Sequence, residues 1–394
     1  MGKEYRMNAL ELLDIISAGE TSNVQFKREI DNYDKIAEEM IAFSNSKGGT
    51  ILIGIEDKKG TIYGLDYQQL QTYSITIAQI AHDNVKPQVF LFTEVVSIPT
   101  MEGDKKVLVI EVSEGVNKPY KDNNGTIWIK QGPDKRRLTD NNEQIRLFQQ
   151  SGLLYIDEMI VPDTSMDDVD NSKVEKYMEV IQKGETEPLI EINDIFLTNL
   201  NILKAGRLTL SGLLVFGKDP QKYRPAFCVK AVSFFGDNIG DSYYRDSRDI
   251  TGTVPELYDH GMLFFMQNLK HVQKGQNFNK PGILEISDIA LAELLQNALL
   301  HRDYSKNAPV RLMIFDNRIE IVSPGCLPNS LTVDNIKLGN AAVRNNLLVS
   351  YCSKLMNYKG FGSGIIRALN HQPNIELIND ESGNQFIVKI PKEN

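Results

Sequence analysis

The sequence predicts a mixed α/β protein, of the α+β kind, with more than one domain. The chain has 394 residues, which is longer than one ordinary hydrophobic core needs. Its composition, 41% hydrophobic and 24% charged, is that of a globular protein. Apolar periodicities typical of helices alternate with short β-branched runs typical of strands.

Residues 1–155 predict a mixed sheet with helices. The glycine turn at 47–49 separates a helical pattern from an apolar run, and the turn at 102–104 joins two alternating runs. We expect helices at 8–18, 33–45 and 70–81, and strands at 23–26, 50–55, 89–98, 106–112 and 125–131.

Residues 156–280 predict a middle region of helical and mixed structure. The acidic segment 161–170 interrupts the apolar pattern and suggests a linker. We expect helical structure at 171–204, a long amphipathic helix at 254–274, and either strands or a strand-flanked helix at 207–217 and 226–236. The Lys-Pro-Gly sequence at 280–282 marks the start of a third domain, 281–394.

The most informative stretch is residues 290–325, where a helix precedes a β-hairpin. Glu293, Asn297 and His301 are spaced four residues apart, so they form one polar stripe on an otherwise apolar helix. Buried polar groups need partners, and a ligand could supply them. The alternative is that His301, Arg302 and Asp303 close the helix, with Arg302 and Asp303 forming structural polar contacts.

Composition excludes some classes of protein. No run of about 18 apolar residues could span a membrane, and no apolar segment of a signal peptide is visible, so we expect a cytoplasmic location and no membrane partner. The three cysteines lack metal-ligand spacing.

A net charge of −9 argues against binding nucleic acid by overall charge. Six basic against two acidic side chains at 118–137 form a local basic patch, or else a solvated hairpin edge.

Two stretches resemble known families. Residues 20–27 (ETSNVQFK), 41–57 (IAFSNSKGGTILIGIED) and 125–132 (GTIWIKQG) resemble the Schlafen-type AlbA-like domain of bacterial proteins. The C-terminal part resembles a degenerate GHKL-type ATPase domain, an α/β sandwich, found in proteins described as transcriptional regulators or RecG-like. The matching residues are Glu293-x-x-x-Asn297 with His301-Arg-Asp-Tyr304, 319–325 (IEIVSPG) and 360–364 (GFGSG).

The Schlafen resemblance implies a metal site in relatives that cut RNA. Its acidic positions correspond to Glu20, Gln25 and Glu56 or Asp57, so one carboxylate is an amide here. A hard cation such as Mg²⁺ prefers charged oxygen ligands, and the exchange removes one charge from the site. The alternative is that these acids are ordinary surface residues.

The same resemblance implies a scaffold that binds nucleic acid. Backbone amides at the glycine turn and basic side chains would contact phosphates. The residues expected to bind are Lys27, Arg28, Asn45, Lys47, Lys130, Arg136 and Arg137.

The GHKL resemblance implies an ATP site. Asn297 would hold a Mg²⁺ that bridges the phosphates, and Glu293 would polarise the attacking water. Such domains usually recognise adenine through an Asp, where this chain has Ser323, so adenine specificity is in doubt. Residues 326–359 would act as a lid. The residues expected to bind the nucleotide are Asn297, His301, Ser323, Gly325, Gly360, Gly362 and Gly364.

Two functions from different classes follow. The first is a regulator that binds DNA or RNA and is switched by a nucleotide. The alternative is a metal-dependent endoribonuclease that uses Glu20, Glu56 and Asp57 and could act in phage defence. A third hypothesis is an ATPase whose substrate is another protein. AlbA-like sheets commonly pair, so we expect a homodimer or a larger closed assembly.

Overall fold

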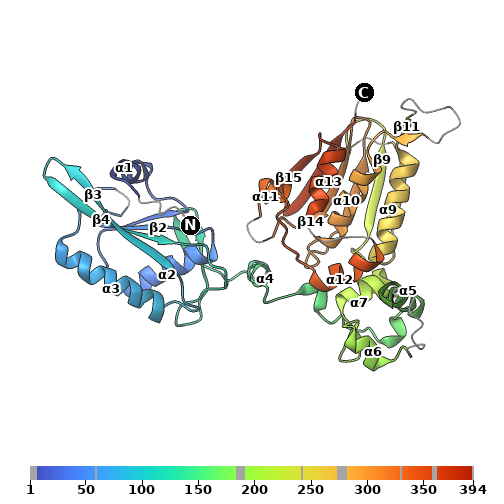
Figure 1. The fold of residues 1–394 in the computed structure, drawn as a ribbon, viewed down its shortest axis with the longest axis horizontal. Helices are drawn as coiled ribbons and strands as arrows, with labels where there is room; N and C mark the ends of the chain where they lie inside the picture. Colours follow the sequence, from blue (N-terminus) through green and yellow to red (C-terminus); the bar gives the residue numbers. More distant parts are fainter. Residues whose placement is uncertain are drawn as a thin grey trace. The chain divides into compact units, whose positions relative to one another are not determined.

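The computed structural model describes residues 7–57, 60–182, 191–240, 243–272, 282–328, 331–356 and 362–392. Contacts divide the chain into two compact units, Met1–Leu154 and Tyr155–Asn394. Helices and strands mix in both units, which confirms the predicted α/β class (Figure 1). In these described ranges, no helix combines the length and apolarity that a membrane crossing requires.

The N-terminal unit is a four-stranded sheet with helices on both faces (Figure 1). The strand order is β1-β2-β4-β3, and only β1 and β2 are parallel. One face packs against α1 and the other against α2 and α3. The elements are α1 (Ala9–Ala18), β1 (Val24–Lys27), α2 (Tyr33–Asn45), β2 (Gly49–Ile53), α3 (Tyr67–Asp83), β3 (Leu91–Thr100) and β4 (Gly103–Val112).

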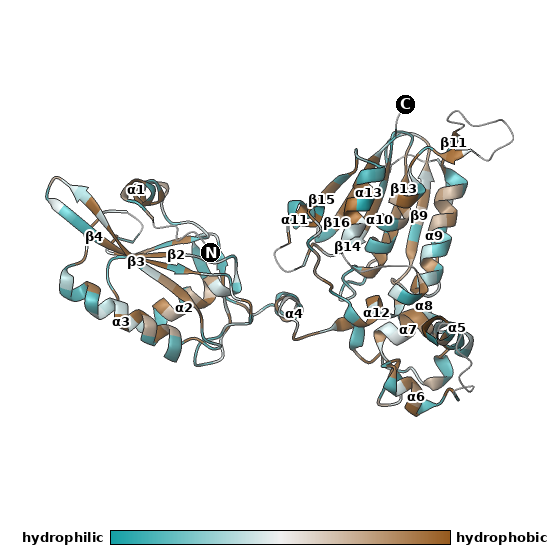
Figure 2. Cartoon of the chain, in the orientation of Figure 1, coloured by the Kyte–Doolittle hydropathy of each residue, from teal (hydrophilic) through white to brown (hydrophobic). Residues whose placement is uncertain are grey.

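Local sequence explains where these helices begin. The side chains of Asn8, Asn32 and Asp66 each accept a hydrogen bond from a backbone N–H of the first helical turn. The central strands carry hydrophobic residues, while α3 mixes hydrophilic and hydrophobic residues (Figure 2). The hairpin of β5 (Trp128–Gln131) and β6 (Asp134–Arg137) follows the sheet, and α4 (Asn141–Gln150) ends the unit.

The C-terminal unit has a six-stranded sheet of order β10-β9-β13-β14-β16-β15. Only β9 and β13 are parallel. Three helices, α9, α10 and α13, lie along one face (Figure 1). These elements are β9 (Val229–Phe234), β10 (Tyr244–Ile250), α9 (Val254–Asn268), α10 (Asp288–Leu300), β13 (Val310–Ile314), β14 (Arg318–Pro324), α13 (Ser363–His371), β15 (Glu376–Asp380) and β16 (Gln385–Pro391).

The shorter elements share one hydrophobic core with this sheet. Tyr177, Phe216 and Tyr351 come from three different helices and pack edge to face with ring centroids 4.9 to 5.6 Å apart. These elements are η1 (Ile156–Glu158), η2 (Met166–Asp168), α5 (Asn171–Gln182), α6 (Asp194–Asn199), β7 (Leu203–Lys204), β8 (Arg207–Leu208), α7 (Leu210–Phe216), α8 (Pro220–Tyr223), β11 (His271–Val272), β12 (Ile283–Leu284), α11 (Val333–Lys337) and α12 (Asn346–Leu355).

Three expectations change in this unit. The acidic segment 161–170 is not a linker, because Val161 and Val169 are buried in the core. The long helix expected at 254–274 ends at Asn268, and residues 273–274 lie outside the described residues. The stretch 207–217, predicted as strands or a strand-flanked helix, forms the strand β8 followed by α7, a helix buried on all sides, so the second alternative holds.

Candidate functional site

Helix α10 places the polar stripe that the sequence predicts. The side chain of Ser287 caps its first turn, and the N–H of His301 donates to the carbonyl of Asn297 where the helix ends. Asn297 and His301 are half-buried, and the apolar residues of the helix enter the core. The helix therefore holds an amide and an imidazole at the edge of a hydrophobic interior.

A pocket of about 880 Å³, its open mouth included, lies beside these two residues. Its walls come from α10, from β14 and β16, from residues 326–342 and from the first turn of α13. Most of its lining residues are apolar, with a few polar side chains among them, as is usual in small-molecule sites. The pocket gathers six residues that the sequence predicts to bind a nucleotide: Asn297, His301, Ser323, Gly325, Gly362 and Gly364. The seventh, Gly360, lies outside the described residues.

Two glycines allow α13 to approach the rest of the pocket closely. A Cβ on Gly364 would lie 2.6 Å from Glu293 Oε2 and 3.3 Å from Asn297 Nδ2. Gly362 has a φ of 72°, and a Cβ there would lie 2.3 Å from the carbonyl oxygen of Gly339. Among the described residues, no side chain caps α13. Its first backbone N–H groups therefore remain available to an anion.

The lid predicted at residues 326–359 is partly helical, with α11 and α12, and residues 329–330 and 357–359 lie outside the described residues. Leu327, Leu331 and Ile336 line the pocket. Arg344 donates to the carbonyl of Cys326 at 2.8 Å and so ties the two ends of this wall together. Ser323 also lines the pocket, and its hydroxyl donates to the carbonyl of Ala298 at 2.8 Å. Its proton is therefore used within the fold.

Glu293 does not line the same pocket as Asn297. It lines a neighbouring polar cavity and forms an ion pair with Arg367 of α13. The sequence expects both residues at one nucleotide site, with Glu293 polarising water. In this conformation the carboxylate is buried and already neutralised by a guanidinium, so it is poorly placed to take up a proton.

His301 gives the pocket a predicted pH dependence. Burial, with a smaller effect of Arg344, lowers its pKa to about 4. Between pH 4 and 6.5 the unfolded state therefore binds more protons, and the free energy of unfolding should fall as the pH falls through this window. Denaturant unfolding of His301→Gln should show a smaller loss. His371→Gln, at an exposed position, is the control, and equal acid sensitivity of all three proteins would contradict this assignment.

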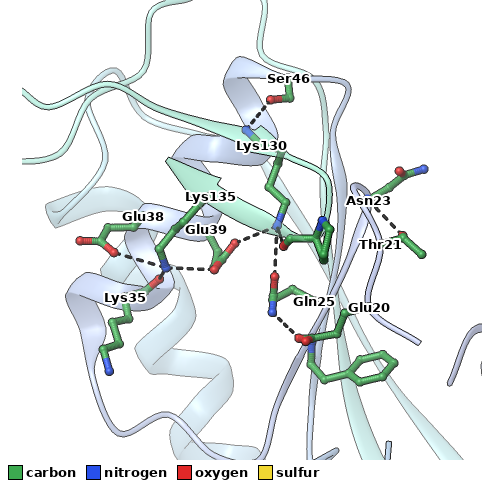
Figure 3. A network of polar contacts seen from close by, with 12 residues as sticks. Glu20, Thr21, Asn23, Gln25, Lys35, Glu38, Glu39, Ser46, Lys130 and Lys135 are labelled. Atoms are coloured by element: carbon green, nitrogen blue, oxygen red, sulfur yellow. Dashed lines mark hydrogen bonds and ion pairs between the residues drawn. The ribbon is translucent and has the colours of Figure 1, made fainter. Parts of the chain in front are cut away.

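The N-terminal unit contains a polar network centred on Lys130 (Figure 3). The Lys130 Nζ donates to Gln25 Oε1 at 3.1 Å and to the Pro133 carbonyl at 2.6 Å, and it lies 3.4 Å from Glu39 Oε2. The side chain of Lys130 is only 2% exposed and that of Glu39 is 6% exposed. Burial lowers the pKa of Lys130, and the charge of Glu39 opposes this shift.

The network continues on both sides of Lys130. Gln25 Nε2 donates to the carboxylate of Glu20, which also accepts the N–H of Phe26 at 2.9 Å. On the other side, Lys135 Nζ lies 2.9 Å from Glu39 Oε1 and 3.3 Å from a carboxylate oxygen of Glu38. Cations and carboxylates therefore alternate through this part of the unit.

The residues expected to bind metal do not form one cluster. Asp57 pairs with Lys27 at 2.8 Å. Glu20 belongs to the Lys130 network, and Glu56 has contacts of its own. Throughout the described ranges, no group of three or more His, Cys, Asp or Glu side chains is arranged to hold a metal ion.

Three of the residues expected to contact nucleic acid have side chains that bind other groups of the N-terminal unit. Asn45 is 5% exposed and its amide binds the backbone of Tyr120 and Trp128, so it is a structural bridge, which corrects the expectation of a direct contact. Lys130 is buried, and Arg136 donates to both carboxylate oxygens of Glu143. The exposed candidates are Arg28, Lys47 and Arg137, with Lys27 half-buried.

Sequence reasoning missed several residues of these sites. Arg367 and Arg344 carry no motif, and their partners Glu293 and Cys326 are not their neighbours in the sequence. Asp157 was missed for the same reason, although it is fully buried.

Comparisons with known proteins agree with the two resemblances. Residues 20–139 match the family described as Schlafen, AlbA_2. Residues 307–390 match the family described as "Putative ATP-dependent DNA helicase recG C-terminal", and residues 146–230 match a domain of unknown function, DUF8451. The chain thus combines a Schlafen AlbA_2 domain with a RecG C-terminal-type domain, as its motifs predict.

No curated protein matches the chain. Among solved structures, the DIP2311 protein from Corynebacterium diphtheriae is similar, with 20% identity and a TM-score of 0.46. That comparison covers 97% of this chain and 79% of the other.

Proposed function

We propose that this protein is a nucleic-acid-binding regulator whose C-terminal unit binds a nucleotide, ATP first among the candidates, as a switch. One observation supports the proposal above all others. Residues that the sequence names separately, from Asn297 to Gly364, line one pocket. The family matched by residues 307–390 is named after an ATP-dependent helicase, and residues 20–139 match a Schlafen domain, which associates both units with nucleic acid.

The pocket offers different surfaces to different parts of a nucleotide. Apolar side chains such as Leu294, Ile321 and Phe386 would pack against the base. The uncapped first turn of α13, with Gly362 and Gly364, would receive phosphate oxygens. Asn297 would supply one oxygen ligand to a Mg²⁺ carried by the nucleotide, whose phosphates and water would supply the others.

Two features favour a nucleotide that stays bound as a signal over one that is hydrolysed for energy. Ser323 replaces the expected Asp and uses its hydroxyl proton on α10, so we expect weak discrimination between adenine and guanine. Glu293 is paired with Arg367, so we expect slow hydrolysis. A bound nucleotide that persists can stabilise one state of the unit by its differential affinity.

Calorimetry with ATP and Mg²⁺ tests the nucleotide site. Asn297→Ala should weaken binding at least about tenfold, a loss of about 1.4 kcal/mol. Asn374→Ala, an exposed position in the same unit, should leave binding unchanged. Absence of nucleotide binding by the unaltered protein would refute the switch.

Retention of DNA and RNA should be measured with and without ATP at several salt concentrations. Binding through exposed cations such as Arg28 and Lys47 should weaken as salt rises. Failure to retain either nucleic acid under all these conditions would remove the nucleic-acid half of the proposal. Light scattering would test the proposed homodimer or larger assembly.

A further inference from the structure

We infer that the ammonium of Lys130 is a built-in cation that takes the place of a divalent metal in the N-terminal unit. Three oxygens surround its Nζ, from Gln25, Glu39 and Pro133. An ammonium has three N–H donors, so this set satisfies all of them. The side chain of Lys130 is almost fully buried, so its ammonium fills the space between Glu20 and Glu39 (Figure 3).

Gln25 is the residue type that fits a lysine at this place. Lys130 can only donate, so the amide oxygen of Gln25 must face it, and the amide nitrogen is left to donate to Glu20. A glutamate at position 25 could accept from Lys130, but it would repel Glu20. A metal, in contrast, would favour the glutamate. Gln25 and Lys130 therefore form a matched pair that suits an ammonium and disfavours Mg²⁺.

The charges of the network lead to the same conclusion. Lys130 and Lys135 offset two of the three charges of Glu20, Glu38 and Glu39, at 2.9 to 3.4 Å from the carboxylates of Glu38 and Glu39, and Gln25 donates to the third carboxylate, that of Glu20. A divalent cation binds where several carboxylates lack compensation and can approach it to 2.0–2.6 Å. The residues present do not fit such an ion. The N-terminal unit should consequently bind nucleic acid without a metal and lack metal-dependent cleavage at this site.

Titration of the full chain with Mn²⁺, without nucleotide, tests this inference by calorimetry. Any Mn²⁺ binding that the unaltered protein shows should be the same in Glu20→Gln. The double variant Lys130→Met with Gln25→Glu removes the internal cation and adds a carboxylate, so it should gain a Mn²⁺ site with at least about tenfold tighter binding. Glu39 keeps Lys135 as a partner in this variant.

The matched control is Lys135→Met with Gln25→Glu, which leaves Lys130 in place and should gain no site. The inference is overturned if the unaltered protein binds Mn²⁺ and Glu20→Gln abolishes it, or if the Lys130 double variant is folded by circular dichroism and gains nothing. Should that variant fail to fold, the Glu20→Gln comparison still decides.

The inference deepens the proposed function by making nucleic-acid binding independent of metal. Retention of DNA or RNA should be the same in EDTA as in Mg²⁺ in the absence of nucleotide. A protein that binds no nucleic acid would contradict the proposed function, whereas the Mn²⁺ titration would still report on Lys130 alone.

Discussion

Replacing Gly364 with alanine should abolish nucleotide binding, which is the largest functional effect expected of a single methyl group in this protein. The new Cβ would lie 2.6 Å from Glu293 Oε2, well inside contact distance. That carboxylate is buried and paired with Arg367, so moving it also disturbs the ion pair. Either the ion pair breaks or the first turn of α13 moves away from Asn297, and both changes distort the pocket.

Stability and binding should respond differently to Gly364→Ala. Alanine favours a helix by up to about 1 kcal/mol over glycine, so the stability of α13 can offset part of the clash. Affinity for ATP, measured by calorimetry, is therefore the decisive quantity, and we expect a loss of more than tenfold. Gly240→Ala is the matched control, because nothing lies within 4 Å of its new Cβ. Unchanged affinity in Gly364→Ala would contradict the proposed pocket.

Asp157→Ala should cause the largest loss of stability. Asp157 Oδ2 accepts the N–H groups of Leu347 and Leu348 at 2.8 and 3.1 Å and thereby caps α12. The residue is fully buried, so alanine would leave both donors without a partner. Each such group costs about 1–3 kcal/mol, and we expect a total of about 2–4 kcal/mol. This loss should lower the Tm by about 5–15 °C.

Asp157→Asn is the matched variant, because its amide oxygen can still accept. Burial raises the pKa of Asp157, so the folded state binds more protons than the unfolded state above the unfolded pKa. Its contribution should favour folding at low pH and be lost as the pH rises through the folded pKa. Asp157→Asn should remove this slope in denaturant unfolding. A Tm of Asp157→Ala within a degree of the unaltered protein would refute the capping role.

Local patterns predicted much of the fold. Helix α2 begins and ends as expected, at residues 33 and 45, because Asn32 supplies a cap and a glycine turn follows. Helix α7 was ambiguous because its seven residues are all buried, which removes the periodicity that separates a helix from a strand. Helix α9 stops before the predicted end, since residues 271–272 pair with β12.

Motifs predicted the residues of the pocket, but not the contacts that organise both units. Lys130 and Gln25 are 105 positions apart, and Asp157 and Leu347 are 190 positions apart. Such pairs leave no trace in local composition, because nothing near either residue identifies its partner. The burial of Asn45 was hidden for the same reason, since its partners lie beyond position 119.

The hydrogen bonds of Asp157 also bear on the order in which the chain folds. The N-terminal unit makes its contacts within residues 1–154, so it can fold as soon as that length has left the ribosome. The C-terminal unit buries the carboxylate at its very start against N–H groups synthesised 190 residues later, and its parallel pair β9–β13 also closes a long loop. Non-local contacts slow folding, and domains generally fold as units during synthesis. The core also needs α13, β15 and β16, which follow α12 in the chain. Until these elements emerge the core is incomplete, and this interval is when a chaperone would matter most.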